Sequence, residues 1–456
     1  MVVSAAASYT LLIVESPVIA RIIQRVAPSS VYVLSTNGYA WKPVYDAERN
    51  QLKAKADPDQ LGFRKELKQQ ASWAGNIIIA TDPDPSGDFI AWSICKFLKN
   101  PSIKRSHIQH LGRKGIERLI SSAEVIQTDL LELRLKNRSL IRHQWNKTGR
   151  RPSMEIAALS STFSSYFAYQ HFADQKGQIW YSNRSIQCAS DEWIQVQNSM
   201  SDSEYHSANP LSTFDLLQLA YEKDIFRSFA NAQETLQQLF THTLDYSEES
   251  LISYPRTSAN SYFSETWASL QQQFFQLNHT GEFKPMFIRN IAGQEVSHES
   301  LYPISLTNTP DKVGGELLST LRDLYDLIYH QTLRAITVPT EKHMAYQTAF
   351  HQDVQFYSTT NKSEISNTEL LPIRTISEIG SLLSSHRVLS PSSFGEKLDR
   401  WISQKYLEMD GAFLKPGKYL APYVNDGPQY ADQIEQLFNL IDEQNLKAET
   451  IASILS

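Results

Sequence analysis

The sequence predicts a multidomain protein with an α/β domain at the N-terminus and mainly helical domains after it, the class α/β plus α. Its 456 residues are enough for two to four domains. With 41% hydrophobic and 20% charged residues, the chain has an ordinary core-forming composition. Strand-like and helix-like runs alternate over residues 1–145, and helical patterns dominate beyond them. We therefore expect a compact α/β domain that is continued by helices.

The first predicted strand ends at an acidic residue. The apolar run Leu11–Val14 indicates a strand, and Glu15 closes it just before the helical spacing of residues 19–26. Another strand is expected at Val31–Leu34, followed by a polar surface excursion over residues 45–74. Glu15 is thus placed at the carboxyl end of a strand.

The central strand of this domain leads into an acidic turn. The run Ile77–Ala80 is apolar, and the turn DPDPSGD after it contains Asp82, Asp84 and Asp88. Ligands of α/β sheets collect beyond the carboxyl ends of strands, and two aspartates two residues apart can direct oxygens at one hard cation, with magnesium as the expected ion. The alternative is that these aspartates only cap the following helix and favour the turn. The carboxylate of Glu15 at another strand end favours the metal site.

The composition excludes several classes of protein. No apolar run approaches the roughly 20 residues that a membrane-spanning helix needs, and the N-terminus lacks the basic start of a signal peptide. We therefore expect a cytoplasmic protein that does not engage a membrane. The two cysteines, Cys95 and Cys188, are too few for a disulfide framework, and we expect both in the core.

Positive charge is concentrated in one segment. The net charge is −6, but residues 96–151 carry 14 Lys and Arg against 4 Asp and Glu, which gives this segment +10 and leaves −16 for the rest. Such a run can be a solvated face. It can also bind phosphates, since Lys and Arg that replace condensed counterions give sequence-independent affinity for DNA. Its position directly after the acidic turn favours a DNA-binding surface.

Beyond the first domain, periodicity and turn residues predict the remaining elements. In chain order they are a helical stretch over 134–172, a polar irregular linker over 181–209, helices starting near Pro210 and over 230–240, an amphipathic helix over 321–336, strands over 343–375 and a terminal helical segment from 389 onward.

One tyrosine is placed where it can act as a nucleophile. The short apolar segment Leu251–Tyr254 ends at Pro255, which cannot continue a helix and fixes a turn. A phenol such as that of Tyr254 can attack a phosphodiester and leave a covalent phosphotyrosine, while the guanidinium of Arg256 stabilises charge on the transferring oxygens. Alone the pair is a weak signal, because the chain has 21 tyrosines and most tyrosines only pack.

Several motifs together resemble those of the type IA DNA topoisomerases. LLIVESPVIARII and ATDPDPSGDFIAWSI are similar to the two motifs of the TOPRIM fold in that family, and LISYPRTS is similar to its nucleophile motif L-I-T-Y-x-R-T/S-D. HESLYP, which contains His298, resembles the family's H-E-A-I-R-P, and Arg150 ahead of a predicted helix resembles its Gly-Arg motif. These motifs occur in family order along nearly the whole chain.

The resemblance implies a topoisomerase that acts on single-stranded segments of negatively supercoiled DNA without ATP. It implies that Tyr254 forms a 5′-phosphotyrosyl link, that a second strand passes through the gap, and that the 3′-hydroxyl reseals it. Magnesium as cofactor, DNA as partner and a monomeric state are implied as well. The implied site residues are Tyr254, Arg256, Glu15 and His298 for catalysis, Glu15, Asp82, Asp84 and Asp88 for the metal, and Lys147, Arg150, Arg151 and Thr257 for DNA.

The same resemblance implies a domain order, with an N-terminal TOPRIM or Rossmann-like domain, helical domains and a small β arch arranged as a toroid. The expected boundaries are 1–145 for the TOPRIM domain, 146–208 for a helical DNA-binding segment and linker, 209–336 for the helical domain with the tyrosine motif, 337–388 for a reduced β arch and 389–456 for a C-terminal helical and winged segment. The interval between 150 and 210 leaves little room for the first strands of the arch.

Some motif positions depart from the family pattern. Ser86 stands where the family's D-x-D-R-E-G-E has a glutamate, Ile19 where many members have a lysine, and Tyr302 where the histidine motif has an arginine. Ser258 replaces the aspartate of the tyrosine motif, and Asp88 is the candidate to replace the lost glutamate. These departures keep open a non-catalytic, topoisomerase-derived DNA-binding protein. A TOPRIM nuclease fits less well, because such an enzyme needs no distant tyrosine motif.

Overall fold

The computed structural model describes most of the chain. It covers residues 9–149, 151–175, 179–188, 191–201, 208–244, 249–277, 282–284, 298–338, 346–351, 354–358 and 367–456. Within these stretches, no helix combines the length and the apolar composition that crossing a bilayer requires. Both cysteines are buried and unpaired, as expected.

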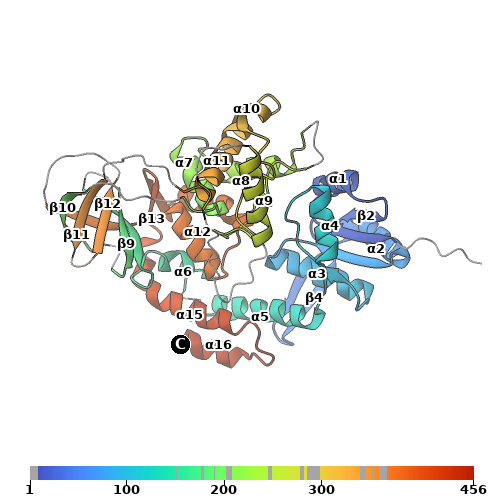
Figure 1. Ribbon diagram of the computed structural model, residues 1–456. Helices are drawn as coiled ribbons and strands as arrows, with labels where there is room; N and C mark the ends of the chain where they lie inside the picture. Colours follow the sequence, from blue (N-terminus) through green and yellow to red (C-terminus); the bar gives the residue numbers. More distant parts are fainter. Residues whose placement is uncertain are drawn as a thin grey trace, which may run out of the picture.

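The N-terminal domain is built on a five-stranded sheet in the order β2-β1-β5-β6-β7 (Figure 1). Four strands are parallel and the edge strand β7 is antiparallel; the bounds are β1 (Thr10–Val14), β2 (Val31–Ser35), β5 (Asn76–Ala80), β6 (Lys104–Arg105) and β7 (Glu124–Val125). The strands predicted at 11–14, 31–34 and 77–80 are confirmed. Val14 of β1 lies in register with Ala80 of β5, so both strands end at the same edge of the sheet.

Helices cover both faces of this sheet because the strand residues alternate between two cores. Leu12 and Val14 of β1 pack in the core that includes residues of α1 and α4, whereas Leu11 and Ile13 pack in the core that includes residues of α2, α3 and α5. The helix bounds are α1 (Pro17–Val26), α2 (Leu61–Trp73), α3 (Pro85–Leu98), α4 (Arg113–Ser121) and α5 (Thr128–Lys147).

The polar excursion predicted over 45–74 has regular structure. Most of it belongs to a β-hairpin of β3 (Trp41–Asp46) and β4 (Gln51–Ala56), the short helix η1 (Pro58–Gln60) and α2. The hairpin forms a separate two-stranded sheet.

A group of helices carries the tyrosine segment. Their bounds are α7 (Thr213–Glu222), α8 (Phe229–Thr241), α9 (Ser264–Gln276), α10 (Pro310–Val313) and α11 (Ser319–Ile336). They confirm the helices predicted near 210, over 230–240 and over 321–336. α7 begins with a reciprocal capping box between Ser212 and Asp215, which satisfies two backbone donors at the helix start.

The prediction for residues 150–209 is largely wrong. After α6 (Met154–Ser161), the chain forms the strands β8 (Tyr169–Asp174), β9 (Ile179–Ile186) and β10 (Ile194–Ser201) where a helical stretch and an irregular linker were expected. The interval therefore does have room for strands of the arch. The reason for the error is that few residues of these strands, such as Trp180 and Val196, enter the small core of this sheet, so their apolar signal is sparse.

These strands belong to an eight-stranded sheet in the order β10-β11-β12-β9-β8-β13-β15-β14. The strands predicted over 343–375 are confirmed as β11 (Tyr346–His351), β12 (Val354–Ser358) and β13 (Asn367–Thr375). The small hairpin of β14 (Leu407–Asp410) and β15 (Phe413–Pro416) joins the sheet through pairing of β15 with β13. This sheet lies at the opposite end of the molecule from the N-terminal domain (Figure 1).

The C-terminal helices pack against helices from earlier parts of the chain. α12 packs on α7, α13 on α8, α15 on α6 and α16 on α5. Their bounds are α12 (Ile376–Ser385), α13 (Phe394–Ser403), α14 (Ala421–Val424), α15 (Gly427–Asn439) and α16 (Ala448–Leu455), with the short helix η2 (Pro391–Ser393) before α13. The largest hydrophobic core therefore runs from α1 of the first domain to α16.

Candidate active site

The tyrosine segment and the acidic turn meet in the structure. The phenol of Tyr254 donates a hydrogen bond of 2.6 Å to Oδ1 of Asp82, and Nη1 of Arg256 donates one of 2.7 Å to Oδ2 of the same carboxylate. The two segments are 172 positions apart in the sequence. Tyr254 is 4% exposed, whereas the side chains of Asp82 and Arg256 are partly exposed. The proposed nucleophile, its arginine and the first aspartate of the turn therefore form one cluster.

Two neighbouring segments hold Tyr254 in place. The peptide N–H of Ser253 donates to the carbonyl of Tyr302 (3.0 Å), and the N–H of Tyr302 donates to Oγ of Ser253 (3.1 Å). On the other side, the N–H of Tyr254 donates to the carbonyl of Gln109 (2.7 Å). The tyrosine segment thus lies between the HESLYP segment and the loop after β6.

His298 packs directly on Tyr254. Its ring stacks on that of Tyr254, with centroids 4.0 Å apart and planes 22° from parallel. Its Nδ1 lies 3.3 Å from Oε1 of Gln109. Burial, together with nearby His107, lowers the pKa of His298 to about 3, so the imidazole is neutral. The structure brings His298 to Tyr254, and its catalytic role stays a prediction.

Glu15 and the aspartates of the turn also lie together. The backbone N–H of Asp82 donates to Oε1 of Glu15 (2.9 Å). Asp84 is the N-cap of α3: its Oδ1 accepts from the N–H groups of Ser86 and Gly87, both at 2.9 Å. The capping role that was the alternative for these aspartates is therefore confirmed for Asp84.

The carboxylates of this cluster are crowded. Burial, and then the charge of Asp82, raises the pKa of Glu15 to about 7. Burial is also the main cause of the raised pKa of Asp84, with a further contribution from Asp82. A hard divalent cation would relieve this repulsion, so Glu15, Asp82 and Asp84 fit such an ion in their donor chemistry. Among the described residues, however, no three His, Cys, Asp or Glu side chains are grouped as metal ligands.

Asp88 does not join these carboxylates. Its Oδ1 accepts a hydrogen bond of 2.6 Å from Nη1 of Arg105, whose Nη2 also donates to the carbonyl of Asp82 (2.8 Å). The guanidinium of Arg105 thus pairs with Asp88, and the expected role of Asp88 as a metal ligand stays a prediction.

The residues assigned to DNA have different positions. Lys147 is exposed at the last turn of α5, and Arg150 lies outside the described residues. Arg151 instead donates to Oε1 of Gln433 (2.6 Å) and to the carbonyl of Leu455, so it holds the C-terminal helices. Thr257 is 2% exposed, and its hydroxyl accepts from the N–H of Ala259 (3.0 Å). Arg151 and Thr257 thus contribute to the fold, and their assignment to DNA stays a prediction.

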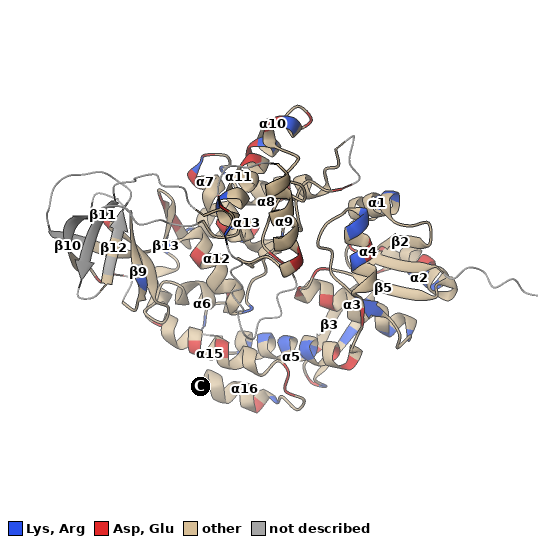
Figure 2. Cartoon of the chain, viewed as in Figure 1, with Lys and Arg blue, Asp and Glu red and all other residues tan. Residues whose placement is uncertain are grey.

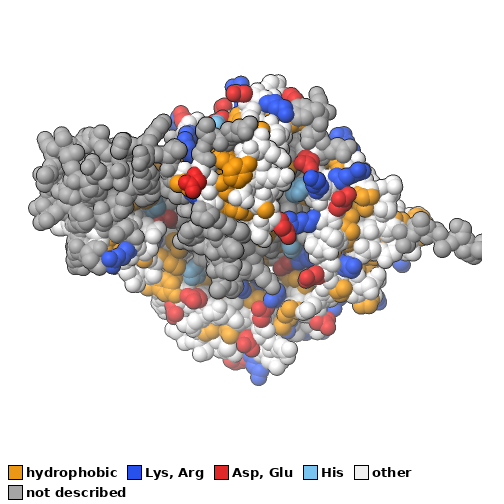
Figure 3. All heavy atoms as spheres, viewed as in Figure 1, with side chains coloured by type: hydrophobic (Ala, Val, Ile, Leu, Met, Phe, Trp, Pro, Cys, Tyr) orange, Lys and Arg blue, Asp and Glu red, His pale blue; other side chains and the backbone are white. Residues whose placement is uncertain are grey.

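Part of the basic segment is neutralised within the protein. Four of its side chains form ion pairs with carboxylates: Lys96 with Glu132, Arg105 with Asp88, Arg118 with Glu265 and Arg134 with Asp442. Other Lys and Arg side chains follow α5 (Figure 2), and the face of the molecule in Figure 3 carries both signs of charge interspersed. The exposed Lys and Arg side chains that the structure describes in this segment are spread over α3 and its C-cap, α4 and α5; they are Lys96, Lys99, Arg113, Lys114, Arg118, Arg142 and Lys147.

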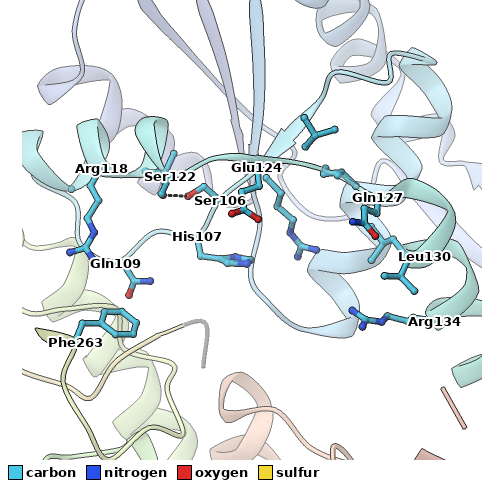
Figure 4. Close-up of a pocket in the computed structure, with 16 residues that line it drawn as sticks. Ser106, His107, Gln109, Arg118, Ser122, Glu124, Gln127, Leu130, Arg134 and Phe263 are labelled. Carbon is cyan, nitrogen blue, oxygen red and sulfur yellow. Dashed lines mark hydrogen bonds between the residues drawn. The ribbon is translucent and has the colours of Figure 1, made fainter. Parts of the chain in front are cut away.

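A cavity of about 540 Å³ lies beside the cluster (Figure 4). His107 and Gln109 line it from the loop after β6, and Phe263 lines it from the tyrosine-bearing helices. His107 also contacts the carbonyl of Thr81 through Nδ1 (3.2 Å) and lies edge-on to His298. No motif or periodicity marks Arg105, His107 and Gln109 in the sequence, because they lie in or just after a strand of only two residues.

Comparison with known proteins supports the assignment of these segments. A family model described as a Toprim domain matches residues 10–113, which include Glu15 and the acidic turn. A family model described as DNA topoisomerase matches residues 151–367, which include Tyr254 and His298. The chain belongs to the type IA DNA topoisomerase family. Its N-terminal domain is accordingly a TOPRIM domain.

The fold of this chain is also similar to that of a solved structure. The structure of full-length topoisomerase I from Thermotoga maritima matches with a TM-score of 0.64 and covers 97% of this chain and 88% of that one. The sequence identity is 14%, so this similarity concerns the fold.

The structure shows what surrounds Tyr302, one of the residues that depart from the family pattern. Tyr302, where the family has an arginine, is 7% exposed, and its phenol donates to Oε1 of Glu299 (2.9 Å). Glu299 also accepts from the N–H of Phe263 and from the hydroxyl of Thr266, so it stabilises the start of α9. Tyr302 is therefore part of the protein core.

Proposed function

We propose that this topoisomerase cuts one DNA strand through Tyr254, passes a second strand through the gap and reseals the first, which relaxes negative supercoils without ATP. The observation that carries the proposal is the contact of the Tyr254 phenol and the Arg256 guanidinium with the two oxygens of Asp82. A nucleophile, a proton acceptor and a cation for the phosphate are thereby within reach of one another.

In this mechanism, Asp82 accepts the proton of the attacking phenol. Burial and the Asp82 charge raise the pKa of Tyr254 well above its usual value, so the resting phenol keeps its proton. During attack, Oη forms a bond to phosphorus, the bond from phosphorus to the 3′ oxygen breaks, and the proton that Asp82 took from the phenol is passed to the leaving 3′ oxygen. Arg256 stabilises the charge on the non-bridging oxygens. In resealing, the 3′-hydroxyl attacks the phosphotyrosine and the phenol recovers its proton.

Magnesium is the proposed cofactor, with Glu15, Asp82 and Asp84 as the residues that would hold it. When bound, the ion would supply positive charge that positions the phosphates of the strand. The protein itself contributes the end of β1, which is followed by Glu15, and the acidic turn, which carries Asp82 and Asp84. A side chain at residue 87 would collide with the Asp82 carbonyl, which explains Gly87 there.

The proposed partner is a single-stranded segment of supercoiled DNA, bound by a cytoplasmic monomer. Lys147 at the exposed end of α5 and Arg150 are among the proposed phosphate contacts of the sequence assignment. A toroidal arrangement of the TOPRIM domain, the helical domains and the β arch is proposed as well, because strand passage needs an opening to receive the second strand. Entry of a phosphate requires the Tyr254 and Asp82 contact to open.

Relaxation of negatively supercoiled plasmid in the presence of magnesium tests the proposal. We expect the wild-type protein to relax the plasmid and to form a covalent adduct with a single-stranded oligonucleotide. The label is placed on the fragment whose 5′ phosphate becomes joined to Tyr254. A protein that binds the oligonucleotide but gives neither relaxation nor an adduct would contradict the proposal.

The alternative is a catalytically weakened or inactive, topoisomerase-derived DNA-binding protein. Two observations favour it: Ser86 supplies no carboxylate to the acidic turn, and the arginine position of the histidine motif holds the buried Tyr302. Binding without adduct formation is the outcome that this alternative predicts.

Replacing Ser86 by glutamate is expected to lower the magnesium requirement of relaxation by at least about threefold, because it restores a negative charge beside Asp84. Ser86 is exposed in the first turn of α3, where an acidic side chain is also compatible with the helix dipole. The midpoint of activity against magnesium concentration is the measurement, with Ser86→Gln as a neutral control of the same size. Equal midpoints for Ser86→Glu and wild type would mean that residue 86 does not face the ion.

A further inference from the structure

Gln109 contacts the nucleophile segment in two ways. Its backbone carbonyl accepts the hydrogen bond from the peptide N–H of Tyr254 (2.7 Å), and Oε1 of its side chain lies 3.3 Å from Nδ1 of His298. His298 in turn stacks on the Tyr254 ring. Gln109 therefore touches both the residue that attacks and the ring that packs against it.

We propose that Gln109 is a positioning residue of the cleavage site, which sets the orientation and the tautomer of His298. The inference rests on the proposed cleavage function. With Oε1 as the acceptor, Nδ1 of His298 carries the proton and Nε2 carries the lone pair. Nε2 is buried and has no hydrogen-bond partner in the part of the chain that the structure describes. The contact with Gln109 thus decides where the proton of the ring lies.

The tautomer matters because a neutral imidazole can donate through only one nitrogen. His298 is 5% exposed, and the ring of His107 lies 5.9 Å away, so burial and a second histidine both disfavour the charged form. A proton held on Nδ1 is therefore absent from Nε2. In the closed site, His298 presents an acceptor where a DNA phosphate would need a donor.

A glutamine can hold either tautomer, since its amide has an acceptor and a donor end. When the amide of Gln109 turns by half a rotation, its N–H group faces Nδ1, and the ring proton moves to Nε2, which then donates to a phosphate oxygen. A carboxylate only accepts, and an apolar side chain does neither. Residue 109 thereby couples the arrival of a phosphate to the direction in which His298 donates.

Nitrogen-15 NMR of histidine-labelled protein tests the tautomer directly, with the His298 signals assigned by their loss in His298→Gln. We expect the Nδ1–H tautomer in the free protein and the Nε2–H tautomer when a single-stranded oligonucleotide binds to Tyr254→Phe, which cannot cleave it. In Gln109→Leu, the preference for Nδ1–H should be lost. An Nε2–H tautomer in the free protein, or unchanged signals in Gln109→Leu, overturns the proposal.

Cleavage kinetics provide the second test. Gln109→Leu should lower kcat for oligonucleotide cleavage by about 10–100-fold and change KM by less than about threefold, as expected for loss of a group that orients a site residue. The matched control is Gln127→Leu, which removes an amide from the other side of the same cavity and should leave both constants unchanged (Figure 4).

The outcomes separate this proposal from the proposed function. Equal kcat values for Gln109→Leu and Gln127→Leu overturn the positioning role, and so does a fall in kcat that is matched by a loss of thermal stability. If the wild-type protein forms no adduct, the cleavage function fails, and the NMR measurement alone decides whether Gln109 sets the tautomer of His298.

Discussion

Replacing Tyr254 by phenylalanine is expected to abolish relaxation and adduct formation, with a loss of about 10⁴-fold or more, as for removal of a catalytic nucleophile. The change removes only the hydroxyl that donates to Asp82. The ring can still stack on His298, and Arg256 can still pair with the free carboxylate. We therefore expect the variant to fold and to bind single-stranded DNA as the wild type does.

Plasmid relaxation and adduct formation are the measurements for this variant, with oligonucleotide affinity measured in parallel. Tyr329→Phe is the matched control, because it removes a buried hydroxyl of the same group of helices that donates to the carbonyl of Leu306 (2.9 Å), away from the acidic turn. Its relaxation rate should stay within about twofold of the wild-type rate. If Tyr254→Phe still forms an adduct, another residue is the nucleophile.

Replacing Arg374 by methionine is expected to lower the free energy of unfolding by about 3–5 kcal/mol, because it leaves buried carbonyl groups without donors. Arg374 is 1% exposed, and its guanidinium donates to the carbonyls of Thr162 (2.7 Å), Phe167 (2.8 Å) and Ala168 (2.9 Å). It also lies 3.5 Å from the ring centroid of Tyr169. One side chain of β13 thus fastens the segment that leads from α6 into β8.

Urea unfolding followed by circular dichroism measures this loss. Arg400→Met is the control, since Arg400 is half exposed and pairs with Glu155 at the surface (3.0 Å), where an ion pair contributes about 0–1 kcal/mol. A loss below about 1 kcal/mol in Arg374→Met would show that the three carbonyls find other donors, including water.

Local sequence was sufficient to predict a strand where the strand itself contains a continuous run of apolar residues. The strands β1 and β5 were predictable because both of their faces are buried, which makes the run of apolar residues continuous. The strands β8 to β10 were not, since their apolar residues are sparse and their partners include β12 and β13, more than 150 residues away. Whether such residues form strands depends on pairing with segments distant in the sequence, and local periodicity carries no information about that pairing.

The same distinction applies to the candidate site. The sequence by itself determined that Glu15 and Asp82 lie just after two strands and that Tyr254 ends a short apolar segment, because strand ends and proline turns are local features. Only the tertiary structure decided that Tyr254 meets Asp82, that Asp88 pairs with Arg105, and that Gln109 contacts His298. These contacts depend on how the tyrosine-bearing helices dock on the TOPRIM domain, and docking follows from the shape and burial of whole surfaces, which no single stretch of sequence encodes.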